Sequence, residues 1–513
     1  MLLHHALESS ARRLPGKTAL VSESERVTYA QLAGRVDQLA RLLQARGVRR
    51  GDRVALLLDN CVELVVGVYA TLRIGAAFMP VSAMSKSGKL AYLLENSGAS
   101  ALLTQESLRE VWREALGRSG SGVHTCVVTG RPGREAEPGD GREVRWPADG
   151  ERADAPGVEP STIDLDLASI IYTSGSTGQP KGVMLTHLNM SSASDSVIEY
   201  LGTREDDVVQ CALPLAFSYG LHHAIMTIRV GATLVIERSF VFPIKVIERM
   251  ASERVTMFPG VPTMYAQLCD LEGIDRFDLS ALRIVTNAGA GITKPGIDRL
   301  RAKLPHATLY SMYGLTECKR VTYLPPEQLD VRPMSVGRGM PNQEHWLVDE
   351  EGRRLPNGST GELVVRGAHV MLGYWENPAE TARALTPGPL PGEHVLHTGD
   401  IFRTDEEGWL YYVARRDDII KCGGEKVSPR EVENAIDSLP GVRESAVVGV
   451  PDPRLGSAVK AFVVPAKGAS LTERDVIRHC HKHLESFKAP RQVVFLEELP
   501  KTDSGKVLKK SLA

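Results

Sequence analysis

The sequence predicts an α/β protein with two domains: a large N-terminal domain of layered, mainly parallel sheets with helices, and a small α+β C-terminal domain. Three observations lead to this expectation. The 513 residues are too many for one ordinary hydrophobic core. Up to about residue 400, short apolar runs alternate with helix-like stretches, which is typical of parallel sheets covered by helices. Beyond that point the alternation ends, and we place the domains at 1–416 and 417–513.

The N-terminal elements are expected in the following order. The opening MLLHHALESSARRLPGKTAL is interrupted by charged residues, so it indicates a surface helix ending near Pro15 rather than a secretory signal. The stretch 117–160 is rich in glycine, proline and charged residues and predicts a long exposed loop. Strands are expected at 53–58, 76–81, 232–236, 255–258, 282–285 and 308–310, and a helix at 62–72.

In the C-terminal part, strands and helices are mixed without the earlier alternation. Two apolar runs flank a PDPRLG turn, so we expect them to pair as neighbouring strands. The expected strands are 409–413, 445–450 and 459–464, and the expected helices are 430–439 and 473–484.

Composition and charge exclude several classes of protein. A net charge of -2, with 42% hydrophobic and 24% charged residues, is ordinary for a globular protein and gives no reason to expect nucleic acid or an anionic membrane as partner. No apolar run approaches the ~20 residues that a membrane helix needs. The seven cysteines are an odd number and lack zinc or redox spacing. We therefore expect free thiols and a cytoplasmic location.

The most informative local motif covers residues 172–182, Tyr-Thr-Ser-Gly-Ser-Thr-Gly-Gln-Pro-Lys-Gly. Its glycines free backbone N–H groups, and its hydroxyls and lysine add donors suited to phosphate oxygens. The spacing differs from that of the P-loop. A flexible linker is the alternative, but the motif lies between an apolar run and a helix-like segment. The candidate phosphate-binding residues are Thr173, Ser174, Gly175, Ser176, Thr177, Gly178 and Lys181.

Five further motifs follow in order along the chain. They are Asn-Ala-Gly-Ala at 287–290, Tyr-Gly-Leu-Thr-Glu at 313–317, Thr-Gly-Asp at 398–400, Arg-Arg-Asp-Asp-Ile-Ile-Lys at 415–421 and Pro-Lys-Thr-Asp-Ser-Gly-Lys at 500–506. Together with the first motif they resemble the adenylate-forming superfamily, which includes acyl-CoA synthetases, the adenylation domains of nonribosomal peptide synthesis and beetle luciferase. One such match is weak, but six in the right order cover essentially the whole chain. By this resemblance the chain is identified as a member.

Two of these motifs suggest an adenine site. The small residues Ala288, Gly289 and Ala290 follow a predicted strand and leave a slot for a flat base. Tyr313 follows another predicted strand and can stack on the base. Ligands of open α/β sheets bind beyond the carboxyl ends of the strands, which is where both segments are expected.

The resemblance assigns the remaining nucleotide contacts. It implies that Asp400 accepts hydrogen bonds from both ribose hydroxyls and that Arg415 contacts ribose or phosphate, with Lys421 of the same motif also in the nucleotide-binding set. Thr316 and Glu317 are assigned to catalysis. Glu317 is the implied ligand of a Mg²⁺ ion that bridges the ATP phosphates, a role suited to a hard oxygen donor.

The C-terminal domain carries three residues to which the resemblance gives a role. Lys506, on an Asp-Ser-Gly turn, is expected to reach the site in the first step and to stabilise the charge that develops on the α-phosphate. Asp417 is the implied hinge about which this domain rotates. Gly424 is the implied lining of the tunnel through which pantetheine arrives, where a side chain would block a narrow thioester arm.

The segment LPLAFSYGL at 213–221 resembles the substrate-pocket region of the family. Relatives that activate amino acids carry an aspartate where this chain has Ser218, and an unpaired buried ammonium is costly, so we expect an acid without an α-amino group. Luciferase-like histidines are absent at Ala216 and Phe217, which puts light production in doubt. Phe217, Tyr219 and Met312 predict an apolar pocket for an alkyl chain or aromatic ring. His222, Cys318 and Lys319 could tune this pocket, but each is expected to be structural or peripheral.

The expected function is therefore an ATP-dependent acid–thiol ligase. It activates an aliphatic or aryl carboxylic acid as an acyl-adenylate with Mg²⁺ and transfers the acyl group to coenzyme A. Two alternatives stay open: transfer to a separate acyl carrier protein, and a non-catalytic nucleotide-binding or scaffold protein. The joint presence of Glu317, Asp400 and Lys506 argues against the second. A homodimer is left open, and the sequence does not identify the acid.

Overall fold

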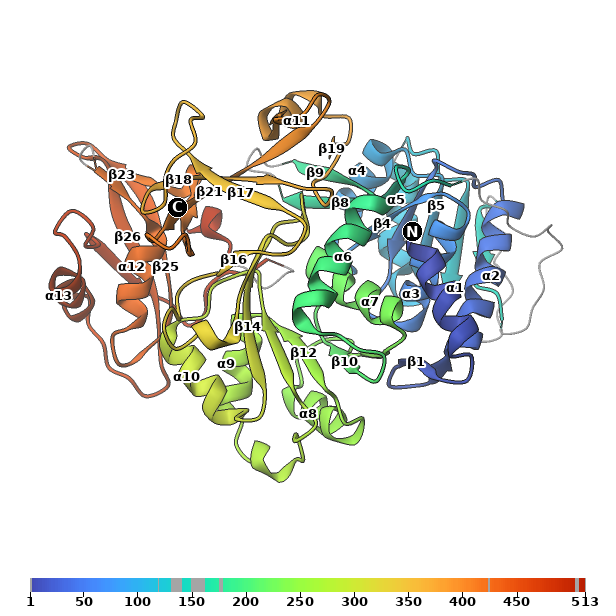
Figure 1. Cartoon of the computed structure of the whole chain (residues 1–513), viewed down its shortest axis with the longest axis horizontal. Coiled ribbons are helices and arrows are strands. Elements are labelled where there is room, and N and C mark those ends of the chain that lie inside the picture. Colours follow the sequence, from blue (N-terminus) through green and yellow to red (C-terminus); the bar gives the residue numbers. More distant parts are fainter. Residues whose placement is uncertain are drawn as a thin grey trace.

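The structure is a computed structural model that describes residues 2–118, 120–130, 141–148, 162–174, 179–422, 425–502 and 507–512, without the side chains of Ser174, Lys426 and Lys510. It is a mixed α/β fold with a large N-terminal domain and a smaller C-terminal domain (Figure 1). The C-terminal elements lie at one end of the molecule, and the N-terminal helices lie at the other (Figure 1). This confirms the predicted fold class.

A nine-stranded sheet forms the first layer of the N-terminal domain, in the order β16-β15-β14-β13-β12-β10-β11-β1-β2. Its central strands, β14 to β1, are parallel, and the edge pairs are antiparallel. Its strands are β1 (Thr18–Val21), β2 (Arg26–Thr28), β10 (Val208–Cys211), β11 (Thr233–Ile236), β12 (Met257–Gly260), β13 (Ile284–Asn287), β14 (Thr308–Tyr313), β15 (Thr322–Leu324) and β16 (Arg338–Gly339).

An eight-stranded sheet forms the second layer, in the order β19-β9-β8-β4-β3-β5-β6-β7. Strands β8 to β7 along this order are parallel, whereas β9 is antiparallel to both β8 and β19. Its strands are β3 (Arg53–Leu57), β4 (Ala77–Val81), β5 (Ala101–Gln105), β6 (Thr125–Thr129), β7 (Glu143–Arg145), β8 (Leu167–Ser174), β9 (Pro180–Thr186) and β19 (Gly373–Tyr374).

Helices connect the parallel strands and bury their apolar faces against the sheets in one large cluster. Helix α6 begins at a capping box in which Thr186 and Asn189 satisfy each other's backbone donors. Helix α7 ends at Gly231, which has the left-handed conformation that glycine tolerates best. The helices of this domain are α1 (Leu3–Arg13), α2 (Tyr29–Ala45), α3 (Val62–Arg73), α4 (Ser87–Ser97), α5 (Arg109–Arg118), α6 (His187–Leu201), α7 (Ser218–Val230), α8 (Pro243–Ser252), α9 (Pro262–Asp270), α10 (Lys294–Lys303) and α11 (Pro378–Ala384).

A third sheet, antiparallel and five-stranded, joins the two layers to the C-terminal domain (Figure 1). Its longest strand, β21, pairs with β18 on one side and with β22 and β20 on the other. The chain leaves the N-terminal domain directly after β22. The strands are β17 (Glu344–Val348), β18 (Thr360–Arg366), β20 (Leu385–Pro387), β21 (His394–Thr404) and β22 (Leu410–Arg415).

The C-terminal domain is a five-stranded sheet with two helices and its own apolar core. The predicted strand pair is present as β25 and β26, antiparallel and in register from Ser445 opposite Val463. The elements are β23 (Ile420–Cys422), β24 (Glu425–Val427), α12 (Pro429–Asp437), β25 (Val442–Asp452), β26 (Gly456–Pro465), α13 (Glu473–His483) and β27 (Gln492–Phe495).

Three expectations were wrong in part. The predicted loop at 117–160 contains β6, which is buried except at Thr129, and the short strand β7; residues 119, 131–140 and 149–160 of it lie outside the described residues. The opening helix is α1, as expected, but Leu3, Ala6 and Leu7 are buried, so only one side of it faces solvent. The alternation was expected to continue to about residue 400, whereas the antiparallel sheet already begins at β17.

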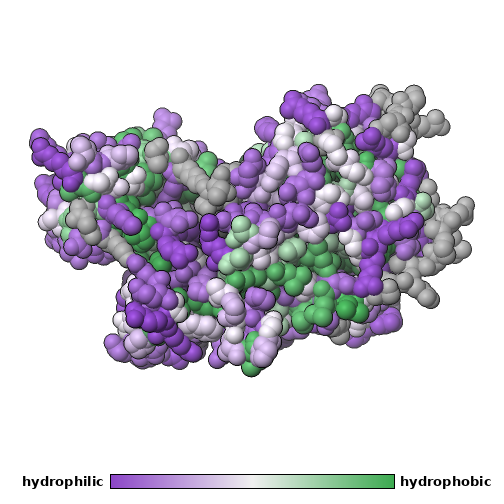
Figure 2. All heavy atoms as spheres, turned by 90° about the horizontal axis from the view of Figure 1, so that it is seen from above, coloured by the Kyte–Doolittle hydropathy of each residue, from purple (hydrophilic) through white to green (hydrophobic). Residues whose placement is uncertain are grey.

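The surface carries few large hydrophobic groups. The face seen from above in Figure 2 is hydrophilic over most of its area, and hydrophobic residues gather near its middle. Among the described helices, none is long and apolar enough to cross a membrane.

Candidate active site

The site is built at the carboxyl ends of β13 and β14, as the sequence predicts. The two strands run parallel with Asn287 opposite Ser311, so the segments that follow them leave the sheet at the same edge. Ala288 is buried, and Gly289 has a φ of +86°, which glycine adopts without strain. The Asn287 side chain donates to the carbonyl of Ala290 at 2.9 Å and closes this turn.

Tyr313, Asp400 and Arg415 form a polar cluster that joins the large sheet to the antiparallel sheet. The Tyr313 hydroxyl donates to Asp400 Oδ2 at 2.5 Å, and Arg415 Nε lies 3.2 Å from Asp400 Oδ1. Asp400 and Arg415 are direct partners across β21 and β22, so strand pairing brings them together. Burial and the Asp400 charge hold the pKa of Tyr313 well above its usual value, so its hydroxyl stays protonated and donates. The predicted adenine and ribose residues therefore meet at one place.

Glu317 lies beside this cluster and is held by a strand of the other sheet. The Tyr374 hydroxyl donates to Glu317 Oε1 at 2.9 Å, and the backbone N–H of Met371 donates to the Glu317 carbonyl at 2.8 Å. Burial, followed by the Glu317 charge, raises the pKa of Tyr374. The Glu317 charge also acts on Arg415, second to that of Asp400 among the charges that raise the arginine pKa.

The described residues test whether the site can hold the implied Mg²⁺. Among them, no group of three or more histidine, cysteine, aspartate or glutamate side chains could form a protein cage for a metal ion. Mg²⁺ is usually bound by one or two carboxylates together with substrate phosphates and water, so a single oriented carboxylate fits it. Glu317, fixed by Tyr374, is such a carboxylate.

The phosphate motif spans the turn between β8 and β9. These strands pair with Thr173 opposite Lys181, but residues 175–178 and the side chain of Ser174 lie outside the described residues. Lys181 forms an ion pair with Glu380 of α11, and its ammonium lies 5.5 Å from the centre of the Tyr374 ring. The base of the phosphate motif and Glu317 are therefore connected through Tyr374. The phosphate-binding role of the motif stays a prediction.

The predicted substrate residues lie next to the same strand ends. Phe217 and Ser218 are partly buried at the start of α7. The Tyr219 hydroxyl contacts the carbonyl and the Oγ1 of Thr286, at 2.9 and 2.8 Å, just before β13 ends. Met312 is buried on β14 and its sulfur lies 2.9 Å from the Tyr200 hydroxyl.

Two basic side chains, Lys319 and Arg320, turn back onto the site. Lys319 was expected to be structural or peripheral, and no role was expected for Arg320. A Cβ on Gly314 would lie 2.5 Å from the carbonyl of Lys319, so glycine is needed for this turn to pack against the end of β14. Lys319 has a φ of +63°, an uncommon value for a residue with a side chain. The Arg320 guanidinium lies 4.8 Å above the centre of the Tyr219 ring. Two adjacent basic residues directly after the Thr-Glu motif were the available signal in the sequence.

The histidines and the cysteine near this turn are buried. Burial and the Arg320 charge lower the pKa of His223 to about 3, and burial, Arg320 and Lys319 hold the pKa of His222 far below its usual value. Burial also raises the pKa of Cys318 well above its usual range. All seven cysteines are free thiols.

The chain leaves the N-terminal domain through a short 3₁₀ turn, Arg416–Asp418. Arg416 donates to Glu362 Oε2 at 3.0 Å and anchors the start of this turn, whereas Asp417 is exposed. Beyond it, Arg430 of α12 donates to the carbonyl of Gly291, next to the adenine segment, at 3.1 Å. Lys421 is exposed on β23; Gly424 and Lys506 lie outside the described residues.

Comparisons with known proteins agree with this geometry. Residues 7–375 match the family model "AMP-binding enzyme", and residues 431–506 match "AMP-binding enzyme C-terminal domain". A long-chain-fatty-acid–CoA ligase of Escherichia coli O6:H1 is 32% identical, over 98% of this chain and 93% of that protein. A feruloyl-CoA synthase of Amycolatopsis sp. is 34% identical, over 97% and 96%. The crystal structure of ATP-bound MatB from Rhodopseudomonas palustris has a TM-score of 0.86 at 30% identity and covers 100% of this chain and 98% of that one.

Proposed function

The chain belongs to the AMP-binding enzyme family and is an ATP-dependent, AMP-forming acyl-CoA ligase, and from this premise we propose how its residues divide the reaction. In the first half-reaction the carboxylate of the acid attacks the α-phosphorus of ATP, and pyrophosphate leaves. In the second, the thiol of coenzyme A attacks the carbonyl of the acyl-adenylate, and AMP leaves.

The meeting of Tyr313, Asp400 and Arg415 at the strand ends is the observation that carries this proposal. Tyr313 stacks on adenine, which rests against Ala288 to Ala290. Asp400 is oriented by the Tyr313 hydroxyl and accepts from the ribose hydroxyls. Arg415, paired with Asp400, faces the ribose and the α-phosphate.

We assign the triphosphate to the motif between β8 and β9. Its backbone N–H groups and hydroxyls, at residues 173–178, bind the β- and γ-phosphates. Lys181 lies near the end of the motif. It forms an ion pair with Glu380, and its ammonium group lies close to the Tyr374 ring. Glu317 would hold Mg²⁺, which offsets phosphate charge when bound. Thr316, beside it, is the neighbouring hydroxyl of this catalytic motif.

The second half-reaction involves a rotation of residues 417–513 about Asp417. The order of the C-terminal sheet supports this proposal, because the β23–β24 turn that contains Gly424 is at one edge and β25 is at the other. Lys501, before the segment of Lys506, pairs with Glu444 of β25 at 3.0 Å. The strands on either side of Gly424 and the strand that Lys501 contacts are therefore at different edges of this sheet, which fits a rotation that presents Gly424 and Lys506 one at a time.

The acid is proposed to lack an α-amino group. The first turn of α7, where Ser218 lies, contains no acidic residue that could pair with an ammonium ion. The names of the two relatives above point the same way, since neither a fatty acid nor ferulate carries such a group. Coenzyme A is the acceptor that these names support, and none of the reported relatives supports a carrier protein. A homodimer and a cytoplasmic location stay predictions.

Pyrophosphate exchange with a panel of acids tests the first half-reaction, and formation of the acyl-CoA tests the second. We expect exchange with aliphatic or aryl acids, dependent on ATP and Mg²⁺, and little exchange with the matching α-amino acids. Exchange that is fastest with α-amino acids would contradict the assignment at Ser218. Acyl-adenylate formation without transfer to coenzyme A would contradict the acceptor.

A further inference from the structure

Four basic side chains are buried together at the end of α7 nearest the site, and no hydrogen bond or ion pair joins any of them to another described side chain. His222, His223, Lys319 and Arg320 are 1%, 0%, 4% and 3% exposed. Both ring nitrogens of each histidine, Lys319 Nζ and Arg320 Nε form no hydrogen bond. Buried polar groups normally find partners, and buried charges are normally paired, so this cluster requires an explanation.

The cluster is one group of side chains rather than four separate ones. The Arg320 guanidinium lies over Tyr219, and the His223 ring lies 5.2 Å from that ring at an angle of 59°. The charges of Arg320, Lys319 and His223 all act on His222. Both histidines are neutral, and burial and the Arg320 charge lower the pKa of Lys319 to about 7, so Arg320 is the permanent cation of the cluster. Neither Arg320 nor Lys319 is in an ion pair with a described carboxylate.

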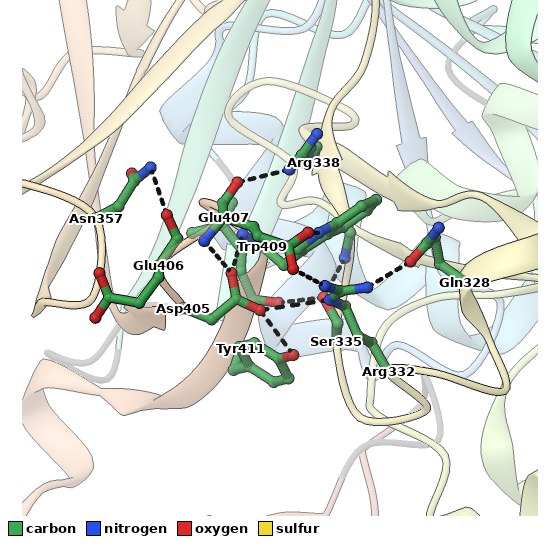
Figure 3. Close-up of polar contacts among 12 residues, drawn as sticks. Gln328, Arg332, Ser335, Arg338, Asn357, Asp405, Glu406, Glu407, Trp409 and Tyr411 are labelled. Carbon is green, nitrogen blue, oxygen red and sulfur yellow. Dashed lines mark hydrogen bonds and ion pairs between the residues drawn. The ribbon is translucent and has the colours of Figure 1, made fainter.

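Two other arginines of this chain, Arg332 and Arg338, lie over an aromatic ring and have acceptors for their N–H groups (Figure 3). Arg332 lies 5.1 Å from the centre of the Trp409 ring and contacts Asp405, Glu407 and Gln328. Arg338 lies 4.1 Å from the same ring and donates to the carbonyl of Glu407 at 2.6 Å. Arg320 has the ring but lacks the acceptors, although it is more deeply buried than either.

The missing acceptor belongs on the acid side of the site. The Arg320 guanidinium lies over the Tyr219 ring, and the Tyr219 hydroxyl is hydrogen-bonded to Thr286 at the end of β13. Tyr219 belongs to the predicted acyl pocket. On the nucleotide side the carboxylates already have partners: Asp400 pairs with Arg415, and Glu317 accepts a hydrogen bond from the Tyr374 hydroxyl. A guanidinium beside an ammonium, with N–H donors around them, is the arrangement that binds a carboxylate.

We propose that the acid activated by this enzyme carries a second carboxylate, which binds to the cluster of Arg320, Lys319, His222 and His223. This rests on the proposed function, because it places the acyl chain between the reacting carboxylate near Glu317 and the cluster beside Tyr219. The substrate class is then a dicarboxylic acid, of which one carboxylate is adenylated and the other is held by the cations. The uncharged part between them contacts the aromatic face of Tyr219.

The test is pyrophosphate exchange with matched acids in the full-length protein. Each member of a length series of α,ω-dicarboxylic acids is paired with the monocarboxylic acid of the same carbon number, and terephthalate is paired with benzoate. We expect the best dicarboxylic acid to exceed its monocarboxylic partner in kcat/KM by about tenfold or more, the scale of one charge-assisted hydrogen bond. Monocarboxylic acids that match or exceed their partners throughout would overturn the inference.

Variants then assign the preference to the cluster. Arg320→Met should lower the ratio of dicarboxylic to monocarboxylic kcat/KM by about tenfold or more. The melting temperature of this variant without acid should stay at or above that of the wild type, because the substitution removes an unpaired buried charge. Arg338→Met is the matched control and should leave the ratio unchanged. Equal loss with both acids, or a large fall in melting temperature, would make Arg320 part of adenylation or of the core and overturn the inference. No exchange with any acid would instead refute the proposed function, and the inference with it.

Discussion

Replacing Asp400 with asparagine tests the nucleotide site most directly. The carboxylate lies between the Tyr313 hydroxyl and Arg415 and is nearly inaccessible to solvent. Asparagine keeps the size of the side chain and one carbonyl oxygen, and it removes the negative charge. A change in the use of ATP therefore reports the charge rather than a cavity.

The expected loss can be worked out from the two ribose hydroxyls assigned to this carboxylate. A hydrogen bond to a charged group contributes about 1.5–3 kcal/mol, compared with about 0.5–1.5 kcal/mol for a neutral pair. The difference is about 1–1.5 kcal/mol per hydroxyl, or about 2–3 kcal/mol for both. At about 1.4 kcal/mol per factor of ten, kcat/KM for ATP should fall by about 30- to 140-fold.

The assay is pyrophosphate exchange with ATP and with 2′-deoxy-ATP. The wild type should prefer ATP, and Asp400→Asn should lose most of that preference, because the 2′-hydroxyl no longer meets a charged acceptor. Asp405→Asn, on the same β21–β22 hairpin but in the cluster of Figure 3, is the control and should keep the wild-type ratio of ATP to 2′-deoxy-ATP. A ratio unchanged in Asp400→Asn would refute the ribose assignment, even if overall activity fell.

The remaining predictions concern the metal, the mobile domain and pH. Glu317→Ala should require more Mg²⁺ and slow exchange by about a hundredfold, the scale for one lost partner of the transition-state charge; wild-type exchange at matched Mg²⁺ would rule out the metal role. Lys506→Ala should slow adenylation by about a hundredfold while a synthetic acyl-adenylate is still converted to thioester, and Gly424→Leu should do the reverse; equal damage to both half-reactions would rule out rotation. Burial raises the pKa of Asp437 to about 6 from its usual 3.8, so stability is lost progressively as the pH rises from about 4 to about 6; the full cost of the charge applies above pH 6 and none of it below about pH 4. Asp437→Asn, which keeps the oxygen bonded to Ser445, should therefore stabilise the protein by about 1–2 kcal/mol at pH 7 and not at pH 4, measured by denaturant unfolding at both pH values.

The part of the fold that could be predicted from the sequence is the part with a local signal. The apolar runs at β3, β4, β11 and β13 mark buried parallel strands, because both faces of such strands need hydrophobic side chains. The antiparallel sheet of β17, β18, β20, β21 and β22 was not expected as a unit, since buried and partly exposed residues are mixed along most of its strands, which therefore lack the continuous apolar runs of the parallel strands. The same holds for β6, whose short apolar run lies among polar loop residues.

In the candidate site, too, residues that belong to a motif could be predicted, whereas partners that no motif marks could not. The motifs placed Tyr313 and Asp400 in one nucleotide site, and the structure brings them into contact. It was not predictable that Tyr374 orients Glu317, because the partner comes from a two-residue strand of the other sheet. The position of Arg320 depends on Gly314 allowing the chain to fold back, a steric relation between two backbones that a motif does not express.

The burial of Cys318 has a chemical consequence for an enzyme that makes an acyl-adenylate. Such an intermediate is an electrophile that any thiolate can attack, whether it belongs to coenzyme A or to the protein. Cys318 follows Glu317 directly, but burial holds its pKa well above its usual range, so the side chain stays a thiol, which is a poor nucleophile. Burial likewise raises the pKa of Cys211 to about 12. The incoming coenzyme A thiol thus meets no competing thiolate from these two side chains, and the activated acyl group is protected from capture by the protein itself.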